Sequence, residues 1–338
     1  MTTISRRRFL GGVALGGAAS LLASAVSAQT VDWGDVAETA RGFDQCRAIL
    51  IYRNGREELA EVFRGPAIGK AVPIKSVSKT IVAALAGVAI DRGEIPSVKT
   101  ELGEIVPKLI PAKADPKVAS ITIENLLTMQ AGLQRTSGRN YGVWVNSRNW
   151  VSNALSRPMV SEPGSGMLYS TGSSHIMGAV LSEVSGKSLL ALARERLGEP
   201  LGFDVPAWTR DPQGRYLGGN EMALTLQAMI SFGEMYLNGG RVNDKQVLSE
   251  EWVRQSLVRV TRSVFSGLGY GYGWFLGESG GTSYALARGY GGQVICIVPD
   301  LDLTIAITSD PNRLARSAGY FGDLQRLIEN RIIPMGRA

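Results

Sequence analysis

Residues that bind metals or form cross-links are scarce in this sequence of 338 residues, which has one histidine, His175, and two cysteines, Cys46 and Cys296. Common zinc and iron sites need several histidine or cysteine ligands, so a metalloenzyme is not expected. A Ser-His-Asp triad would depend on His175 alone, and its place within an expected helix favours a structural role. The two cysteines could form one disulfide bond in an exported protein, but two buried free thiols are the preferred interpretation.

The chain also lacks the charge and glycine patterns of nucleic-acid-binding and nucleotide-binding proteins. Its 36 basic and 30 acidic side chains give a net charge of +6, which is low for a nucleic-acid binder. Gly186-Lys187-Ser188 is similar to the end of a phosphate-binding loop, but Leu181 occupies the position of the first glycine. The glycine-rich segment 267–273 lacks the dinucleotide-binding spacing and is expected to form a turn. We therefore expect no nucleic-acid partner.

The first 28 residues have the pattern of an export signal. Arg6, Arg7 and Arg8 precede Phe9-Leu10, and a weakly hydrophobic run follows, ending in the small residues around Ala28. Paired arginines before such a run are typical of a twin-arginine signal, which exports folded proteins. We expect cleavage after Ala28 and a periplasmic mature protein. A membrane anchor is the alternative, but the run is short and interrupted by glycine, and no later segment approaches a transmembrane span.

Strand patterns occur only near the two ends of the mature chain, and helical patterns lie between them. Expected strands are 46–52, 58–63, 284–290, 294–298 and 303–308. Expected helices are 76–92, 122–129, 148–155, 172–184, 189–197, 224–236 and 313–330. The pattern predicts an α/β (α+β) fold, in which both chain ends build one antiparallel sheet flanked by helices. We expect an α/β domain of residues 29–100 and 247–338, and a mainly helical domain of residues 101–246.

One motif places a nucleophile at the start of a buried helix. In Ser76-x-x-Lys79, the serine falls at the helix start, where unpaired N–H groups stabilise a negative charge. The lysine lies one turn later on the same face. A desolvated lysine loses its proton more easily and can then activate the serine hydroxyl. The alternative is a capping serine and an exposed lysine, but the apolar helix 76–92 leaves little exposed face.

A second motif lies in the turn-rich segment 162–172, where Pro163-Gly164 precedes Tyr169-Ser170-Thr171. Together with Ser76-x-x-Lys79 and the segment 121–133, it resembles the serine β-lactamase and penicillin-binding superfamily. The match is closest to the class C-like branch of esterases and 6-aminohexanoate-dimer hydrolases, and it extends from about residue 47 to residue 330. The resemblance implies a β-lactamase/transpeptidase-like fold.

The resemblance also implies roles for individual residues. Ser76 corresponds to the acylated nucleophile, Lys79 to its activating partner, and Tyr169 to the tyrosine that transfers protons to the leaving group and activates water. Thr171 stands where the family often has asparagine, which is expected to remove an amide contact to Lys79 and to the substrate. A rival for the second motif is Ser147-Arg148-Asn149, which lacks the preceding Pro-Gly and the following helix.

The third superfamily motif, Lys-Thr-Gly, has no literal match, and the strand ending at Arg288-Gly289-Tyr290 is its expected counterpart. Gly289 would let the backbone approach the substrate, and Arg288 could contact a substrate carboxylate. The backbone N–H groups of Tyr290 and Ser76 would form the oxyanion hole. Four aromatic residues are candidates for either the pocket lining or the core: Tyr141, Trp144, Trp208 and Trp274.

These features predict a periplasmic serine hydrolase that cleaves a small ester or amide through an acyl-enzyme, without a cofactor. The alternative enzymes are a β-lactamase or a D-alanyl-D-alanine peptidase. A ligand-binding or cell-wall-binding protein that kept the fold and lost turnover is the alternative outside enzymes, but the joint presence of Ser76, Lys79 and Tyr169 argues against it. The sequence indicates neither a natural substrate nor an oligomeric state.

Overall fold

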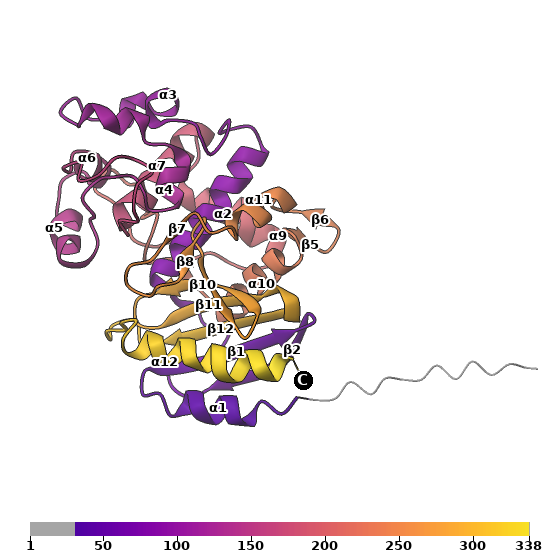
Figure 1. Ribbon diagram of the computed structural model, residues 1–338. Coiled ribbons are helices and arrows are strands. Elements are labelled where there is room, and N and C mark those ends of the chain that lie inside the picture. The colour runs from indigo at the N-terminus through magenta and orange to yellow at the C-terminus, as the bar shows by residue number, and fades with distance from the viewer. Residues whose placement is uncertain (1–30, 338) are drawn as a thin grey trace, which may run out of the picture. The chain divides into compact units, whose positions relative to one another are not determined.

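The centre of the structure is an eight-stranded antiparallel sheet that joins the two ends of the chain, as predicted (Figure 1). The computed structural model describes residues 31–337, so the expected signal peptide and its cleavage site lie outside the described residues. The strand order is β2-β1-β12-β11-β10-β9-β8-β7. These strands are β1 (Cys46–Arg53), β2 (Arg56–Val62), β7 (Thr261–Arg262), β8 (Gly269–Tyr270), β9 (Phe275–Ser279), β10 (Thr282–Gly289), β11 (Gln293–Val298) and β12 (Leu303–Ser309).

A two-residue turn joins the first two strands of the sheet. Asn54 and Gly55 join β1 to β2 with φ values of 51° and 68°, the left-handed conformation that a two-residue hairpin turn requires. β1 then pairs with β12 along its length, from Cys46 opposite Ser309 to Arg53 opposite Leu303. This pairing closes the sheet between segments about 250 residues apart in the sequence.

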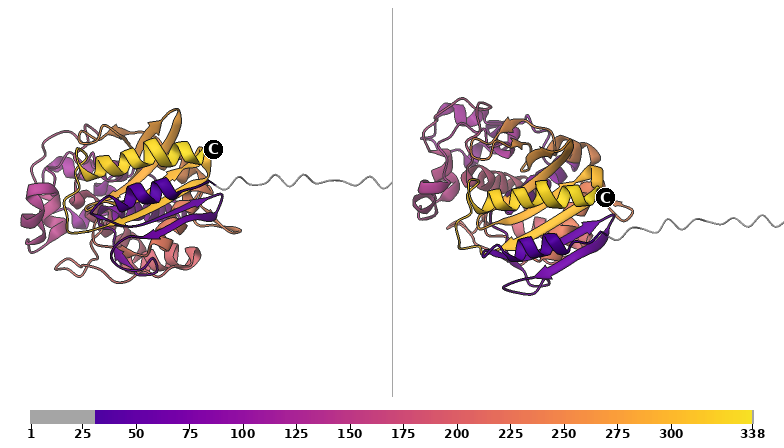
Figure 2. Two further views of the ribbon diagram at one scale, coloured as in Figure 1. Left: turned by 90° about the horizontal axis from the view of Figure 1, so that it is seen from below. Right: turned by 60° about the horizontal axis from the view of Figure 1, so that its bottom comes forward.

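Helices cover both faces of the sheet (Figure 2). One core contains Ala48 and Leu50 of β1 together with residues of α2 (Ser78–Asp91) and α10 (Leu226–Leu237). The other contains Ile49 and Ile51 with residues of α1 (Gly34–Arg41) and α12 (Tyr320–Leu327). Because alternate residues of a strand face opposite sides, burial on both faces explains why these strands are continuous apolar runs. Cys46 and Cys296 are buried and unbonded, which is the preferred interpretation.

The remaining elements form the helical part and its connections. They are α3 (Leu102–Ile105), α4 (Ile123–Leu127), α5 (Tyr141–Val145), α6 (Trp150–Leu155), α7 (Thr171–Ser185), α8 (Leu189–Ala193), α9 (Glu199–Leu201), α11 (Glu250–Ser256) and α13 (Ile333–Gly336). Short ladders join β3 (Val72–Pro73) to β4 (Ala223–Leu224) and β5 (Arg241–Val242) to β6 (Lys245–Gln246). The predicted division into an α/β domain and a mainly helical domain stays a prediction. Helix α10, which falls in the expected helical domain, packs on β11 and β12 of the sheet.

Two of the differences from the expectations involve glycine. The glycine-rich segment 267–273, expected to be only a turn, contributes β8, and a Cβ at Gly271 would lie 2.2 Å from the Ser256 carbonyl oxygen. Gly271 therefore permits close packing of the backbone in addition to a turn. The last helix begins at Tyr320 rather than at residue 313, because Gly319 has a non-helical backbone (φ −140°, ψ −132°). Residues 315–318 instead form part of a pocket wall.

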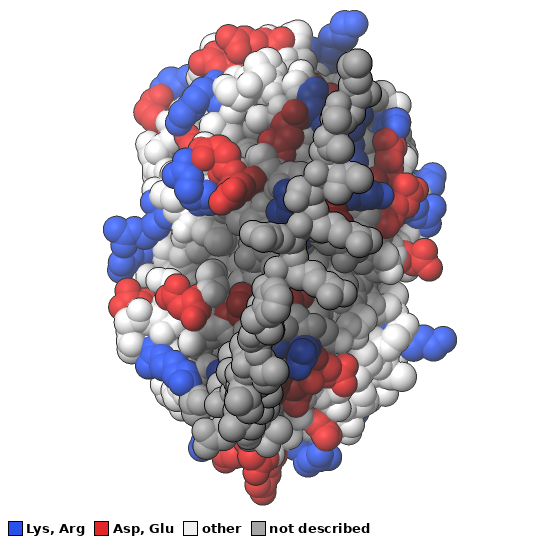
Figure 3. All heavy atoms as spheres, turned by 90° about the vertical axis from the view of Figure 1, so that its right-hand side faces the viewer, with Lys and Arg blue, Asp and Glu red and all other residues white. Residues whose placement is uncertain are grey.

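Acidic and basic side chains are interspersed over the described part of the face shown in Figure 3. Among residues 31–337, no single helix is both long and apolar enough to cross a membrane. One pair of helices passes the same test by length and composition only, and it is bent by 86° between Ser185 and Leu189.

Candidate active site

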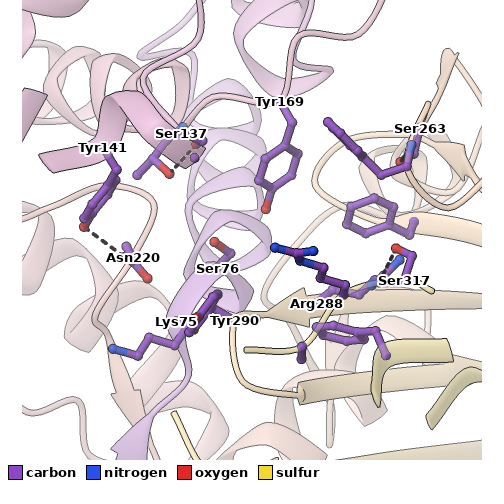
Figure 4. Close-up of a pocket in the computed structure, with 18 of the residues that line it drawn as sticks. Lys75, Ser76, Ser137, Tyr141, Tyr169, Asn220, Ser263, Arg288, Tyr290 and Ser317 are labelled. Atoms are coloured by element: carbon purple, nitrogen blue, oxygen red, sulfur yellow. Dashed lines mark hydrogen bonds between the residues drawn. The ribbon is translucent and has the colours of Figure 1, made fainter. Parts of the chain in front are cut away.

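Ser76 lies in the wall of a cavity of about 1070 Å³ between the helical part and the end of the sheet (Figure 4). The serine belongs to a 3₁₀ turn, Lys75–Val77, that leads directly into α2. Four residues from other segments line the same cavity: Tyr169, Thr171, Arg288 and Tyr290. The structure therefore brings together the residues of all three sequence motifs.

Lys79 is the centre of the polar contacts behind Ser76. Its Nζ lies 2.9 Å from Ser76 Oγ, 3.2 Å from Thr171 Oγ1 and 2.5 Å from the Gly219 carbonyl oxygen. Thr171 has no amide to offer, and its hydroxyl makes a contact to Lys79 in place of the amide contact. Thr171 is in turn held by Ser137, whose Oγ lies 3.0 Å from Thr171 Oγ1 and accepts the Thr171 N–H at 2.9 Å.

The environment of Lys79 favours its neutral form. The side chain is buried, and burial lowers the pKa of Lys79 from 10.5 to about 7. No carboxylate among the described residues lies within ion-pair distance of its Nζ to offset this desolvation. Near neutral pH a substantial fraction of Lys79 is therefore unprotonated and able to accept a proton from the Ser76 hydroxyl, one hydrogen bond away.

Tyr169 approaches Ser76 from the opposite side of the cavity. Its hydroxyl points toward the space between Ser76 and Arg288 (Figure 4), and its ring centroid lies 5.1 Å from Lys79 Nζ. Burial raises the pKa of Tyr169, although the Ser76 hydroxyl and the positive charge of Arg288 act in the other direction. At neutral pH the phenol therefore keeps its proton and can donate it to a leaving group.

The end of β10 packs directly on the backbone before the nucleophile. A Cβ at Gly289 would lie 2.2 Å from the Ile74 carbonyl oxygen, so only glycine permits this contact. Gly289 was expected to allow the substrate to approach, but the closest approach that it permits is to the chain itself. Tyr290 follows the last residue of β10, lies beyond the strand ladder and lines the same cavity as Ser76. This arrangement suits a two-donor oxyanion hole.

Arg288 projects from the same strand onto the face opposite Gly289, as alternation along a strand requires. Its guanidinium lies 4.1 Å from the ring centroid of Phe321 and 5.0 Å from that of Phe275, and Nη2 donates to Ser317 Oγ at 3.1 Å. Burial lowers the pKa of Arg288 to about 10, so the group remains cationic at neutral pH. The cavity therefore has a fixed positive charge beside Tyr169.

An ion pair that sequence reasoning missed supports the nucleophile. Lys75 Nζ lies 2.8 Å from Glu221 Oε1, and both side chains line the cavity. Lys75 and Glu221 have φ values of 51° and 65°, a left-handed conformation that costs residues with a side chain about 1–3 kcal/mol. The two strained residues are 146 positions apart, so no local pattern could have indicated the pair.

The rival candidates lie elsewhere. Ser147 donates to the Trp144 carbonyl and Asn149 caps α6, and both line a different cavity from the one at Ser76. His175 is buried, with Asp211 on one ring nitrogen and the Gly218 N–H on the other. Of the four aromatic candidates, Tyr141 lines the cavity at Ser76, whereas the others pack in or against the hydrophobic cores: Trp144, Trp208 and Trp274.

Comparisons with known proteins identify the family and the fold of the chain. The sequence model of the beta-lactamase family matches residues 40–326. No curated protein resembles the chain closely enough to count as a match. The solved structure of EstCE1, described as a hydrolase with promiscuous acyltransferase activity, is similar with 18% identity and a TM-score of 0.71, covering 88% of this chain and 96% of its own.

Two further structures share the fold. A candidate 6-aminohexanoate-dimer hydrolase from Bacillus anthracis has 17% identity and a TM-score of 0.68, covering 86% of this chain and 79% of its own. A penicillin-binding protein homologue from Caulobacter crescentus has 15% identity and a TM-score of 0.67, covering 81% and 90%. The family match spans most of the described chain, and the fold agrees with it: the chain belongs to the beta-lactamase family of serine hydrolases.

Proposed function

We propose that this protein cleaves small esters or amides through an acyl-enzyme formed on Ser76. The observation that carries the proposal is the contact of 2.9 Å between Ser76 Oγ and a buried lysine whose pKa burial lowers to about 7. A serine in this contact can lose its proton to Lys79 near neutral pH, whereas an isolated serine is a weak nucleophile.

In the acylation step, Ser76 Oγ attacks the carbonyl carbon of the substrate while its proton passes to neutral Lys79. The N–H groups of Ser76 and Tyr290 hold the oxygen that becomes negative. When the carbon–oxygen or carbon–nitrogen bond breaks, the leaving group takes a proton from the Tyr169 hydroxyl, and Lys79 returns a proton to that tyrosine. The products of the step are the released alcohol or amine and an ester on Ser76.

Deacylation reverses these roles with water as the nucleophile. A water molecule in the cavity gives a proton to the Tyr169 oxygen as the water oxygen attacks the acyl carbon, while the proton of the Tyr169 hydroxyl passes to neutral Lys79. Lys79 then returns a proton to Ser76 Oγ as the acid leaves. The positive charge of Arg288 acts to lower the pKa of Tyr169, so the phenol passes its proton to Lys79 more easily than burial alone would allow.

Two features support esters and linear amides over β-lactams as substrates. The strand that faces Ser76 has Arg288 where β-lactam-processing relatives have a hydroxyl residue, and Thr171 offers no amide to an acylamino side chain. We expect kcat/KM for a p-nitrophenyl ester or a 6-aminohexanoate-type amide to exceed that for a chromogenic cephalosporin. A cephalosporin as the best of the three would favour the β-lactamase alternative.

The decisive experiment is the intact mass of the protein after exposure to a fluorophosphonate and, separately, to a penicillin. Wild type should gain one fluorophosphonate adduct, and Ser76→Ala should gain none while unfolding at nearly the same temperature. Ser78→Ala is the matched control, because Ser78 Oγ donates to the Lys75 carbonyl and does not line the cavity. Labelling of neither kind in wild type would favour a binding protein without turnover.

We also propose the periplasm as the site of action and a small ester or amide as the binding partner. Support for the location is the twin-arginine pattern at Arg6-Arg7, which lies outside the described residues.

A further inference from the structure

His175 is a buried histidine outside the cavity, and both of its ring nitrogens have partners. Nδ1 accepts the Gly218 N–H at 3.2 Å, so this nitrogen carries no proton. Nε2 lies 3.2 Å from Asp211 Oδ2 and is therefore the protonated nitrogen that donates to the carboxylate. The rings of Trp144 and Trp150, each with its centroid 5.7 Å from that of the histidine, pack against the imidazole.

Asp211 is fixed independently of the histidine. Its Oδ1 accepts the backbone N–H groups of Gln213 at 2.9 Å and Arg215 at 2.8 Å. Burial raises the pKa of Asp211, but the hydrogen bonds from His175 and from these two N–H groups outweigh burial, and the net effect lowers the pKa. The carboxylate is therefore charged at neutral pH and holds the Nε2-protonated tautomer of the histidine.

The segment that His175 holds is also the one that contacts Lys79. Gly218 and Gly219 pack on α7 so closely that Cβ atoms on them would lie 2.4 Å from the Ser174 carbonyl oxygen and 2.7 Å from Ser174 Cβ. One residue beyond the bond to His175, the Gly219 carbonyl accepts the hydrogen bond from Lys79 Nζ at 2.5 Å. The chain then continues to Glu221, which pairs with Lys75.

We propose that His175 is a positioning residue, which fixes the backbone at Gly218 and so holds the next carbonyl against the ammonium of Lys79. A glycine pair has no side chains to anchor it, so its backbone needs an external partner to keep one conformation. The imidazole is that partner, and Asp211 selects the tautomer that can accept. For its catalytic consequence the inference rests on the proposed hydrolase function.

Two substitutions separate the two bonds of the imidazole. His175→Asn places an amide oxygen near the position of Nδ1 and keeps an acceptor for Gly218, but loses Asp211. His175→Gln reaches toward Asp211 and loses the acceptor for Gly218. Asp211→Asn changes almost no volume. The oxygen of the new asparagine keeps the two backbone N–H groups that Asp211 Oδ1 accepts, so its NH₂ group faces His175 Nε2. The imidazole must then accept at Nε2 and carry its own proton on Nδ1, where that proton opposes the Gly218 N–H.

The first readout is the pH dependence of kcat and KM for p-nitrophenyl butyrate. The proposal predicts that His175→Gln and Asp211→Asn lower kcat by roughly 10- to 10²-fold with little change in KM, since small displacements of a catalytic group cost up to about this factor. Loss of the carbonyl acceptor also disfavours the charged lysine, so the acidic limb of kcat/KM should move below its wild-type position near pH 7. His175→Asn should stay closest to wild type.

A second readout does not depend on activity. Titration of the Lys79 side chain by NMR in ¹³C-lysine-labelled protein, assigned with Lys79→Met, should show the same downward shift of its pKa in His175→Gln and Asp211→Asn. The titratable group that faces Lys79 from the neighbouring elements is Tyr169, beside which lies Arg288, and both stay unchanged in these variants. If Ser76→Ala retained ester hydrolysis, the proposed function would fail, and the lysine titration would still test the positioning role.

Three results would overturn the proposal. One is a folded His175→Gln protein whose Lys79 pKa and pH profile equal those of wild type. Another is a variant series in which His175→Asn is as impaired as His175→Gln, because the acceptor for Gly218 would then be irrelevant. If His175→Gln does not fold, Asp211→Asn decides the matter alone, and an unchanged lysine pKa in that variant would count against the proposal.

Discussion

Replacement of Lys79 by methionine is expected to stabilise the protein at pH 7 while abolishing hydrolysis. Burial lowers the pKa of Lys79 to about 7, so the unfolded chain, with its ordinary lysine pKa of 10.5, binds the proton more tightly than the folded protein. One pKa unit corresponds to about 1.4 kcal/mol, so this difference favours unfolding by about 4 kcal/mol at pH 7. Methionine is similar in volume and carries no charge, so it removes this contribution.

The lost hydrogen bonds act in the opposite direction. The Gly219 carbonyl is left without the lysine, at a cost of about 1–3 kcal/mol for a buried unpaired acceptor. Thr171 keeps its hydrogen bonds to Ser137, and Ser76 faces the cavity. The free-energy cost of their lost hydrogen bonds to the lysine is therefore smaller. The expected net gain in the free energy of unfolding is therefore about 1–3 kcal/mol at pH 7, the kind of exchange between stability and activity that active sites show.

Urea unfolding at pH 7 and pH 9 measures this gain. Between the two pH values the unfolded lysine stays protonated while the folded one is already neutral, so wild-type stability rises with pH and the advantage of Lys79→Met shrinks by about 2 kcal/mol. Lys108→Met, at an exposed lysine, is the matched control and should show neither effect. A Lys79→Met protein that is less stable than wild type by the same amount at both pH values would refute the reasoning.

Three further predictions concern the second motif, the end of β10 and export. Tyr169→Phe should lower kcat by about 10²- to 10⁴-fold without unfolding the protein, whereas Ser147→Ala should do little; the reverse order would move the site to the rival motif. Gly289→Ala, whose Cβ would lie 2.2 Å from a backbone carbonyl oxygen, should displace the strand and lower kcat by up to about 10³-fold, and unchanged kinetics would remove this strand from the oxyanion hole. Replacing Arg6 and Arg7 by lysine should keep the precursor in the cytoplasm on fractionation, and normal secretion would contradict a twin-arginine signal.

The strands and the buried helices could be predicted because their apolar residues lie in long local runs. β11 and β12 are buried throughout and consist mainly of apolar and β-branched residues, and α2 is buried on almost every side. β9 could not be predicted in the same way, because its fit depends on a partner: a Cβ at Gly277 would lie 2.3 Å from the Tyr284 ring on the neighbouring strand. Pairing between strands, rather than propensity, determines such an element.

The same division applies to the site. Ser76, Lys79 and Tyr169 lie in short motifs at the starts of helices, where local spacing has chemical meaning. The Gly219 carbonyl and the ion pair between Lys75 and Glu221 have no such signature, because backbone acceptors look alike in a sequence and the contacts join segments about 140 residues apart. These partners depend on how the chain returns to α2, which only the tertiary structure specifies.

The pairing of β1 with β12 determines when during synthesis the protein can complete its sheet. Ile49 of β1 lies opposite Ile307 of β12. Until nearly the whole chain has left the ribosome, β1 can therefore pair only with β2, and its other edge stays exposed. β10, which faces Ser76 across the cavity, arrives equally late. Contacts of such long sequence separation make folding slow, and the exposed strand edge invites association with other chains in the meantime. A nascent chain is therefore expected to need protection from aggregation before its proposed active site is assembled.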